Sequence, residues 1–143
     1  MKLVVLGDSD AVVGAAAENI AIFVRMHTPS RIGLATGKTQ EGLYQALVEE
    51  HMSQRLSFAG SRFFMLDEYL GVDPFGSESF QGQLRRTFLD KISVPHDSLE
   101  ALDGNAQDIA AESGRFERAI VESGGIDLQL LGIGTNGHIG FNE

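Results

Sequence analysis

The sequence predicts an α/β fold, in which a doubly wound, mostly parallel open sheet carries helices on both faces in a Rossmann-like arrangement. Short apolar runs alternate along the 143 residues with longer segments of helical periodicity, the pattern of strands joined by crossover helices. The last run, residues 126–133, is almost continuously apolar, as expected for a parallel strand covered on both faces. A chain of this length that is 43% hydrophobic supports one compact domain, so a single domain over 1–143 is expected.

The first unit opens with a predicted strand over residues 2–6, where the sequence KLVVL is rich in aliphatic and β-branched side chains. A helix follows over 10–27. Ser9 or Asp10 is the expected N-cap, because their side-chain oxygens can accept a hydrogen bond from the first turn. The run RIGLA at 31–35 predicts the second strand.

The middle of the chain continues the alternation. Apolar residues at helical spacing predict a helix over 39–51, and the sequence RFFML predicts a third strand over 62–66. The next helix is expected over 77–92 and should end before Pro95, because proline disfavours helical backbone in the residue before it. Residues 98–102 predict a short fourth strand.

The last unit pairs a predicted helix over 106–123 with the strand at 126–133. Gly124 and Gly125 are expected to stop the helix, since glycine is favoured just past a helix C-terminus. In an open parallel sheet, ligands bind beyond the carboxyl ends of the strands. The residues that follow each strand are therefore the candidates for function.

Composition restricts the class of partner. Eleven basic residues against twenty acidic ones give a net charge of −9, which argues against nucleic acid and against anionic membrane surfaces. The absence of cysteine excludes a disulfide framework and a cysteine zinc site, and it suits a cytoplasmic location. We expect a soluble protein without a targeting segment. An anionic small molecule is compatible with this charge if backbone N–H groups supply local positive potential.

The first candidate site is the turn between the second strand and the following helix, formed by Thr36, Gly37, Lys38 and Thr39. Glycine permits close approach of the backbone, and the free N–H groups at a helix start attract an anion, helped here by two threonine hydroxyls. An ordinary capped turn would contain similar residues, and the pattern does not separate the two interpretations. A Walker A loop is rejected, because three residues rather than four separate Gly33 from Gly37.

The second candidate site follows the third strand, where Asp67 and Glu68 are adjacent and precede Tyr69. One of the two carboxylates is expected to face the cleft. Partial desolvation would raise its pKa toward the working pH of a general base. The alternative is a solvated loop in which an acid caps a turn.

The third candidate site lies after the fifth strand, where Gly132, Gly134 and Gly137 spell Gly-x-Gly-x-x-Gly. A nucleotide-binding fingerprint of this form should open a helix and be followed about 20 residues later by an acid. Residues 138–143 are a poor helix start, so the nucleotide interpretation is the weaker one.

His138 gives the same loop a second interpretation. An imidazole can titrate near neutrality and move a proton, and Asn136 and Glu143 can converge on the ring to position it and to stabilise its charged form. The alternative is a histidine that only hydrogen-bonds within a turn. A phosphate cradle, a carboxylate base and a histidine at one sheet edge suit proton transfer next to the carbonyl of a sugar phosphate.

Four motifs in order, IGLATG, FFMLDEYLGV, LDGNAQD and GGIDLQLLGIGTNGHIGFNE, resemble those of the glucosamine-6-phosphate deaminases in the glucosamine/galactosamine-6-phosphate isomerase family. The related 6-phosphogluconolactonases share the fold and a Gly-His loop, but a threonine-alanine-serine pattern follows the histidine where this chain has IGFNE. Sugar-binding domains of some transcription regulators also share the fold. A lactonase and a non-catalytic sugar-phosphate-binding module are therefore the alternatives.

The resemblance implies an aldose-ketose isomerisation with deamination, which converts glucosamine 6-phosphate to fructose 6-phosphate and ammonia without a metal or organic cofactor. It implies that Asp67 is the base that moves the C2 proton to C1. His138 matches the residue that assists opening of the pyranose ring, and Glu143 matches its carboxylate partner. The resemblance also implies a homo-oligomer.

The resemblance further places Gly37 and Thr39 in a phosphate loop and gives Tyr69 and Gly137 supporting roles. Two departures from the family pattern bear on the site. Asn136 replaces an aspartate found in some members, which keeps a hydrogen bond but removes a charge that would raise the histidine pKa. Lys38 and Gln40 stand where the loop often carries a small residue and a proline, so the phosphate would gain a direct cation.

The largest departure from the family pattern is length, because family members continue through further strands and helices. We therefore expect an N-terminal portion whose domain is incomplete at its C-terminal end. The fifth strand, 126–133, should then have an exposed side. The motifs do not decide between glucosamine and galactosamine as the sugar.

Overall fold

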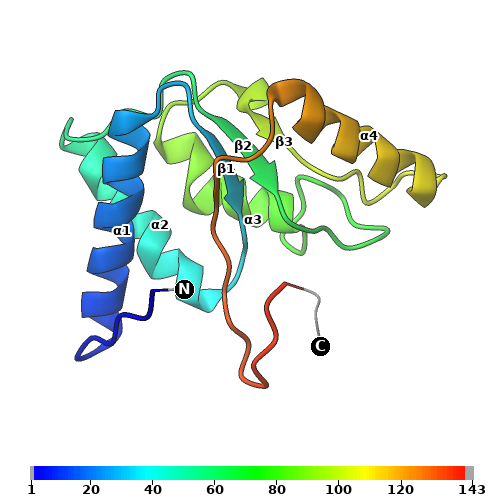
Figure 1. Ribbon diagram of the computed structural model, residues 1–143. Helices are drawn as coiled ribbons and strands as arrows, with labels where there is room; N and C mark the ends of the chain where they lie inside the picture. The colour runs from blue at the N-terminus through cyan, green and yellow to red at the C-terminus, as the bar shows by residue number, and fades with distance from the viewer. Residues whose placement is uncertain (1, 141–143) are drawn as a thin grey trace.

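The computed structural model describes residues 2–140, and Figure 1 shows how the strands and helices of this part are arranged. The strands form one sheet, with helices packed against it. The helices are α1 (Ser9–Met26), α2 (Lys38–Met52), α3 (Phe80–Thr87) and α4 (Ile109–Ser123), with short 3-10 turns η1 (Leu89–Lys91) and η2 (His96–Ser98). The strands are β1 (Arg31–Leu34), β2 (Arg62–Met65), β3 (Leu99–Glu100) and β4 (Leu128–Gln129).

The sheet is parallel throughout and has the strand order β3-β2-β1-β4. Ile32 of β1 lies in register with Phe63 of β2 on one side and Leu128 of β4 on the other. The strand order reverses at β1, because β2 and β3 extend the sheet in one direction and β4 in the other. This confirms the predicted open parallel sheet and places its topological switch point between β1 and β4.

The larger part of the core lies on one face of the sheet. Ile32 and Leu34 of β1 and Phe63 of β2 join a single buried cluster with side chains from α1, α2 and α3. Phe88, just after α3, lies edge-on to Phe58 and Phe63, with ring centroids 5.4 and 6.0 Å apart. These contacts fix the face that α1, α2 and α3 cover.

The opposite face is covered by α4, as the predicted helices on both faces require. Phe64 of β2 points away from the main cluster and meets Phe116 of α4, with ring centroids 6.4 Å apart. Arg115 of α4 forms ion pairs with Glu100 of β3 and with Glu112. A hydrophobic contact and a charged network therefore both hold α4 on the sheet.

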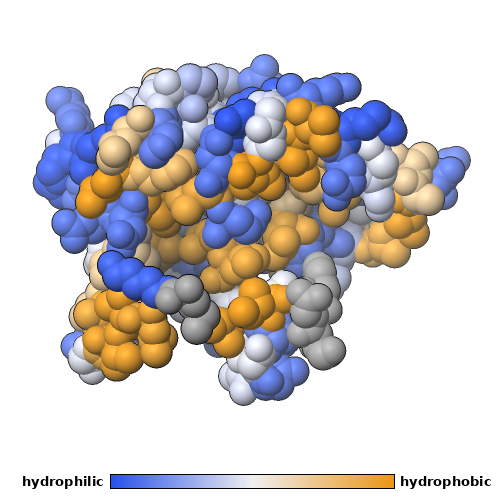
Figure 2. All heavy atoms as spheres, viewed as in Figure 1, coloured by the Kyte–Doolittle hydropathy of each residue, from blue (hydrophilic) through white to orange (hydrophobic). Residues whose placement is uncertain are grey.

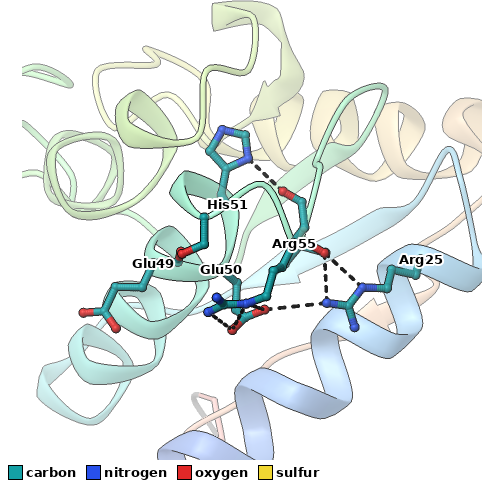
Figure 3. Close-up of polar contacts among 7 residues, drawn as sticks. Arg25, Glu49, Glu50, His51 and Arg55 are labelled. Carbon is teal, nitrogen blue, oxygen red and sulfur yellow. Dashed lines mark hydrogen bonds and ion pairs between the residues drawn. The ribbon is translucent and has the colours of Figure 1, made fainter.

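Polar contacts join α1 to the end of α2, as Figure 3 shows. Arg25 of α1 donates from Nε and Nη2 to the carbonyl oxygen of Arg55, at 3.2 and 2.9 Å. The Arg55 guanidinium in turn donates to Glu50 Oε1 at 2.7 Å. Hydrogen bonds from Arg55 lower the pKa of Glu50, so this carboxylate stays charged between the two arginines.

The predicted strand over residues 2–6 is wrong. These residues form no strand, and the side chains of Leu3 and Val5 are 80% and 84% exposed. An aliphatic run supplies β propensity only, whereas a strand also needs a partner for its backbone groups, and β4 pairs only with β1 among the described strands. Figure 2 shows the resulting apolar surface at the lower left, over the N-terminal segment and the start of α1.

The boundaries of the helices predicted over 10–27, 39–51 and 106–123 shift by at most three residues. Asp8, rather than Ser9 or Asp10, is the N-cap of α1, and its Oδ1 accepts a hydrogen bond from the Ala11 N–H at 2.8 Å. Asp108 caps α4 in the same way, so that helix begins at Ile109 instead of residue 106. Ser, Asp and Asn are near-equivalent caps, so sequence alone does not choose among neighbours.

The predicted helix over 77–92 is shorter in the structure. It begins at Phe80, after the N-cap Ser79, and its α-helical part ends at Thr87 because Phe88 adopts φ −135° and ψ −66°. The chain then continues as η1. Gly124 ends α4 in the left-handed conformation, as predicted.

The predicted strands at 98–102 and 126–133 also shrink, to β3 and β4. The expectation that 126–133 is covered on both faces is wrong, because Gln129 is exposed and the side chains of Leu131 and Ile133 are 43% and 75% exposed. The exposed side expected for this strand is confirmed, since β4 lies at the edge of the sheet that the described strands form. Arg31 anchors the approach to β4 by donating to Asp127 Oδ1 at 2.7 Å.

None of the helices in the described part is long and apolar enough to cross a membrane.

Candidate functional site

A pocket of about 300 Å³ lies at the carboxyl ends of β1, β2 and β4, next to the switch point. Its lining comes from three segments that are far apart in the sequence, namely 35–40 after β1, 66–67 after β2 and parts of 132–140 after β4. The three predicted candidate sites therefore meet in one place. Parallel strands bring their carboxyl ends to a common edge, which explains this convergence.

The turn from β1 into α2 presents N–H groups that have no backbone acceptor among the described residues. Gly37 is the N-cap of α2 with φ 131°, a conformation that only glycine adopts readily. The Gly37 carbonyl accepts from the Gln40 and Glu41 N–H groups, whereas the N–H groups of residues 37–39 have no backbone acceptor among the described residues. Three such donors at a helix N-terminus form an anion cradle.

Two further features of this turn support the anion cradle. The Tyr44 hydroxyl donates to the Ala35 carbonyl at 2.5 Å, which fixes the start of the turn against the buried face of α2. Lys38 is the first residue of α2, where a cation is disfavoured by the helix dipole, and it forms no ion pair with any described residue. A bound anion would compensate for this placement.

Asp67 and Glu68 have opposite environments. Asp67 lines the pocket, and its pKa is raised by partial burial and by the neighbouring charge of Glu68. Partial burial acts in the same direction on Glu68, but hydrogen bonds, led by the Gln81 N–H and the Ser79 hydroxyl, outweigh it and lower the Glu68 pKa. A pair of acids whose pKa values are pushed apart is typical of a site that uses one of them as a base.

The Glu68 carboxylate holds the N-terminus of α3 instead of facing the pocket. Its Oε1 accepts from the Tyr69 and Phe80 N–H groups at 2.9 and 3.1 Å. Its Oε2 accepts from the Ser79 hydroxyl at 2.7 Å and the Gln81 N–H at 3.0 Å. This anchoring fixes the loop that follows Asp67 and thereby orients Asp67.

Replacing Glu68 with glutamine is expected to lower the free energy of unfolding by about 2 kcal/mol at neutral pH, because an amide nitrogen would face two N–H or O–H donors. Chemical denaturation measures this change. The Glu68 pKa is lowered in the fold, so the wild-type carboxyl stabilises the protein above its ordinary pKa and loses that effect as pH falls through the lowered pKa. The variant should therefore lose less stability in acid, and an unchanged acid profile would contradict the anchoring role.

The segment after β4 forms a tight loop that carries His138. Ile133 and Ile139 form an antiparallel bridge, and the Gly134 N–H donates to the His138 carbonyl at 2.9 Å. The Gly137 N–H donates to the Gly134 carbonyl at 2.9 Å, and Gly137 has φ 89°. Glycine is needed at 137 for this turn.

Asn136 positions the His138 ring. Its Oδ1 accepts from the His138 backbone N–H at 3.3 Å and lies 2.5 Å from His138 Nδ1. A carbonyl oxygen can only accept, so Nδ1 carries the proton and Nε2 is the basic nitrogen of the neutral ring. The positioning role of Asn136 stays a prediction.

Gly134 allows the ring to lie where it does. A methyl group built on Gly134 would lie 2.2 Å from His138 Cε1 and within 2.7 Å of both ring nitrogens. The imidazole therefore rests directly on the Gly134 backbone. Any side chain at 134 would displace the ring.

The structure brings most of the predicted site residues to the pocket, where Asp67 and His138 join the residues of the 36–39 turn. Asn136 contacts the ring without lining the pocket. Tyr69 lies outside it, 57% exposed and tilted against Phe80 with ring centroids 4.6 Å apart. Gly137 shapes the loop, and Glu143 lies outside the described residues.

Gln40 is 6% exposed and lines the pocket, although the sequence pattern indicates no functional role for it. Gly134 appears in that pattern only as part of a nucleotide fingerprint. Residues 132–140 contain no helix, which removes the nucleotide interpretation. Among the residues from 2 to 140, no group of three or more histidine or acidic side chains is arranged to hold a metal ion.

Residues 8–140 match the family described as glucosamine-6-phosphate isomerases/6-phosphogluconolactonase. The chain belongs to this family. It is 39% identical over 143 residues to a glucosamine-6-phosphate deaminase of Rhodococcus jostii (strain RHA1). The matched region covers all of this chain and 55% of that protein. A glucosamine-6-phosphate deaminase of Corynebacterium aurimucosum is 41% identical over the same length and is covered to 56%. The chain thus spans little more than half the length of these curated relatives.

Solved structures of the isomerase/lactonase family agree with this assignment. The whole chain superposes on 59% of a monomeric glucosamine-6-phosphate deaminase with a TM-score of 0.95 and 36% identity. The 6-phosphogluconolactonase of Trypanosoma cruzi gives a TM-score of 0.79 and 27% identity, with 96% of this chain and 60% of that one covered. The deaminase branch of the family is the better match in both measures.

Proposed function

We propose that the protein is a glucosamine-6-phosphate deaminase, converting glucosamine 6-phosphate and water to fructose 6-phosphate and ammonia. The observation that carries this proposal is the meeting of an anion cradle, a partly desolvated carboxylate and a positioned histidine in one pocket. The identity to curated deaminases supports it. A sugar phosphate is the small molecule that such a set of groups suits.

In the proposed reaction, the phosphate is held by the N–H groups and hydroxyls of residues 36–39. His138 Nε2 exchanges a proton with the ring oxygen as the pyranose opens, while Asn136 holds the Nδ1–H. Asp67 then removes the proton from C2 and returns it to C1, through an intermediate with a C1–C2 double bond. Addition of water at C2 and loss of ammonia leave the ketose. Glu143 as the carboxylate partner of His138 stays a prediction.

Ammonia and fructose 6-phosphate should appear in equal amounts when the purified protein is mixed with glucosamine 6-phosphate, and a coupled assay of both products tests this. Hydrolysis of a sugar lactone without ammonia would instead identify a 6-phosphogluconolactonase. Saturable sugar-phosphate binding without turnover would identify a binding module. Galactosamine 6-phosphate in the same assay decides which sugar is the substrate.

Replacing Lys38 with methionine is expected to raise KM for the phosphorylated sugar about tenfold with little change in kcat, because the cation contacts the phosphate equally before and during the reaction. The variant should also show a weaker dependence of kcat/KM on salt. Lys91→Met is the matched control, since Lys91 is exposed on η1 and does not line the pocket. A normal KM in Lys38→Met would remove Lys38 from the phosphate site.

We further propose that the protein acts in the cytoplasm, which its cysteine-free sequence suits. The homo-oligomer expected from the resemblance stays a prediction. One similar solved structure is of a monomeric deaminase, so light scattering of the purified protein is the deciding measurement.

A further inference from the structure

We propose that Gln40 determines phosphate recognition in this pocket, by donating a hydrogen bond from its neutral side-chain amide to the phosphoryl group beside Lys38. This inference rests on the proposed function, because it takes the ligand to be a phosphate monoester. It concerns a residue at which the sequence departs from the family's phosphate-loop pattern.

The position of the Gln40 amide is the first observation. A methyl group built on Gly37 would lie 2.9 Å from Gln40 Oε1, and one built on Gly132 would lie 2.6 Å from Gln40 Nε2. The amide is therefore wedged between the anion cradle and the loop that leads to His138. It occupies the junction of the two halves of the pocket.

The burial of Gln40 is the second observation. The residue is 6% exposed and lines the pocket, and its side-chain amide makes no hydrogen bond with another described residue. Among the described residues, the amide atoms of Gln40 are not fully buried, so the unpaired amide faces the open space of the pocket. A ligand oxygen in the pocket would satisfy the Nε2 donor.

The chemistry of the side chain is the third observation. Gln40 is the third residue of α2, where glutamate or glutamine commonly reaches back to the N–H of the N-cap. No such bond to Gly37 forms here. A glutamate would stabilise the positive end of the helix better, but its charge would repel a phosphate dianion. Glutamine has the same shape as glutamate, but its neutral amide can donate a hydrogen bond to an anion.

Isothermal titration of the purified protein with inorganic phosphate tests the inference without requiring turnover. Gln40→Glu, which keeps the shape, is expected to raise the Kd about 10- to 100-fold through charge repulsion. Gln40→Met, which removes only the donor, is expected to raise it about fivefold. Thermal unfolding should show Gln40→Glu to be at least as stable as the wild type, because a carboxylate suits this helix position.

Matched controls come from the same helix. Gln45 is exposed on α2 and donates to Glu49 Oε1 at 3.2 Å, so Gln45→Glu and Gln45→Met should bind phosphate as the wild type does. A Kd for Gln40→Glu equal to that of the wild type would overturn the inference. So would a wild-type protein that does not bind phosphate, or Gln40 variants that weaken only the binding of unphosphorylated glucosamine.

The failure of this inference and the failure of the proposed function give different results. A protein that binds phosphate through Gln40 but releases no ammonia keeps the inference and overturns the deaminase activity. A protein that releases ammonia with the same KM in wild type and Gln40→Glu keeps the activity and overturns the inference.

Discussion

Replacing Asp67 with asparagine is expected to lower kcat for ammonia release by about 10²- to 10⁴-fold, the usual contribution of a general base. The carboxylate lines the pocket, whereas its neighbour Glu68 is held by α3 and cannot substitute for it. Asparagine keeps the size of the Asp67 side chain but cannot take up a proton at neutral pH. The loss should therefore fall on kcat more than on KM.

The same substitution is expected to raise the free energy of unfolding at neutral pH. The Asp67 pKa is raised in the fold by burial and by Glu68, so as pH rises through the ordinary aspartate range the unfolded chain ionises more readily than the folded one. The folded protein thus loses stability over that interval and carries the deficit at neutral pH. Asparagine has no ionised form and removes the deficit.

Activity and denaturant unfolding of the wild type and Asp67→Asn measure the two effects together. The wild-type kcat/KM should fall as pH drops through the raised Asp67 pKa, since the base must be ionised. Asp90→Asn is the control, because Asp90 is exposed on η1, and it should change neither quantity. An inactive Asp67→Asn that is also destabilised would indicate a structural role for Asp67 instead of a catalytic one.

The inner strands β1 and β2 could be predicted because their residues are buried by neighbours on both sides, so the apolar run and the fold agree. Residues 2–6 carry a similar aliphatic pattern and form no strand. The difference lies in the presence of a hydrogen-bonding partner, which a local pattern does not encode. Partner choice is the part of the fold that depends on distant residues.

The candidate site also contains residues that the sequence predicts and one, Gln40, whose role depends on distant residues. Asp67, His138 and the 36–39 turn were predicted because each follows a strand, and parallel strands end at one edge. Gln40 was given no role, since a polar residue in the first turn of a helix is ordinarily solvated. The Gln40 side chain can point into the pocket because Gly132, which is distant in the sequence, has no side chain and leaves room for the amide.

Replacing Gly134 with alanine is expected to lower kcat about 10²-fold, the size of effect that a misplacement of about 1 Å has on a reacting group. The added methyl group would lie 2.2 Å from His138 Cε1, so the ring must move, and its hydrogen bond to Asn136 would break. Gly134 does not have a positive φ, so the fold should lose little stability. Steady-state kinetics and the imidazole NMR signals of His138 measure the two consequences.

Gly14→Ala is the matched control for Gly134→Ala. Gly14 lies within α1 with open space around its Cα, so alanine should leave kcat unchanged and stabilise the helix by about 0.5–1 kcal/mol. For Gly134→Ala, unchanged His138 signals would show that the ring does not depend on the glycine. Shifted signals with full kcat would instead exclude the proton transfer assigned to His138. A displaced ring together with a low kcat is the one outcome that supports the prediction. It would mean that the placement of His138 on the Gly134 backbone sets the rate of ring opening.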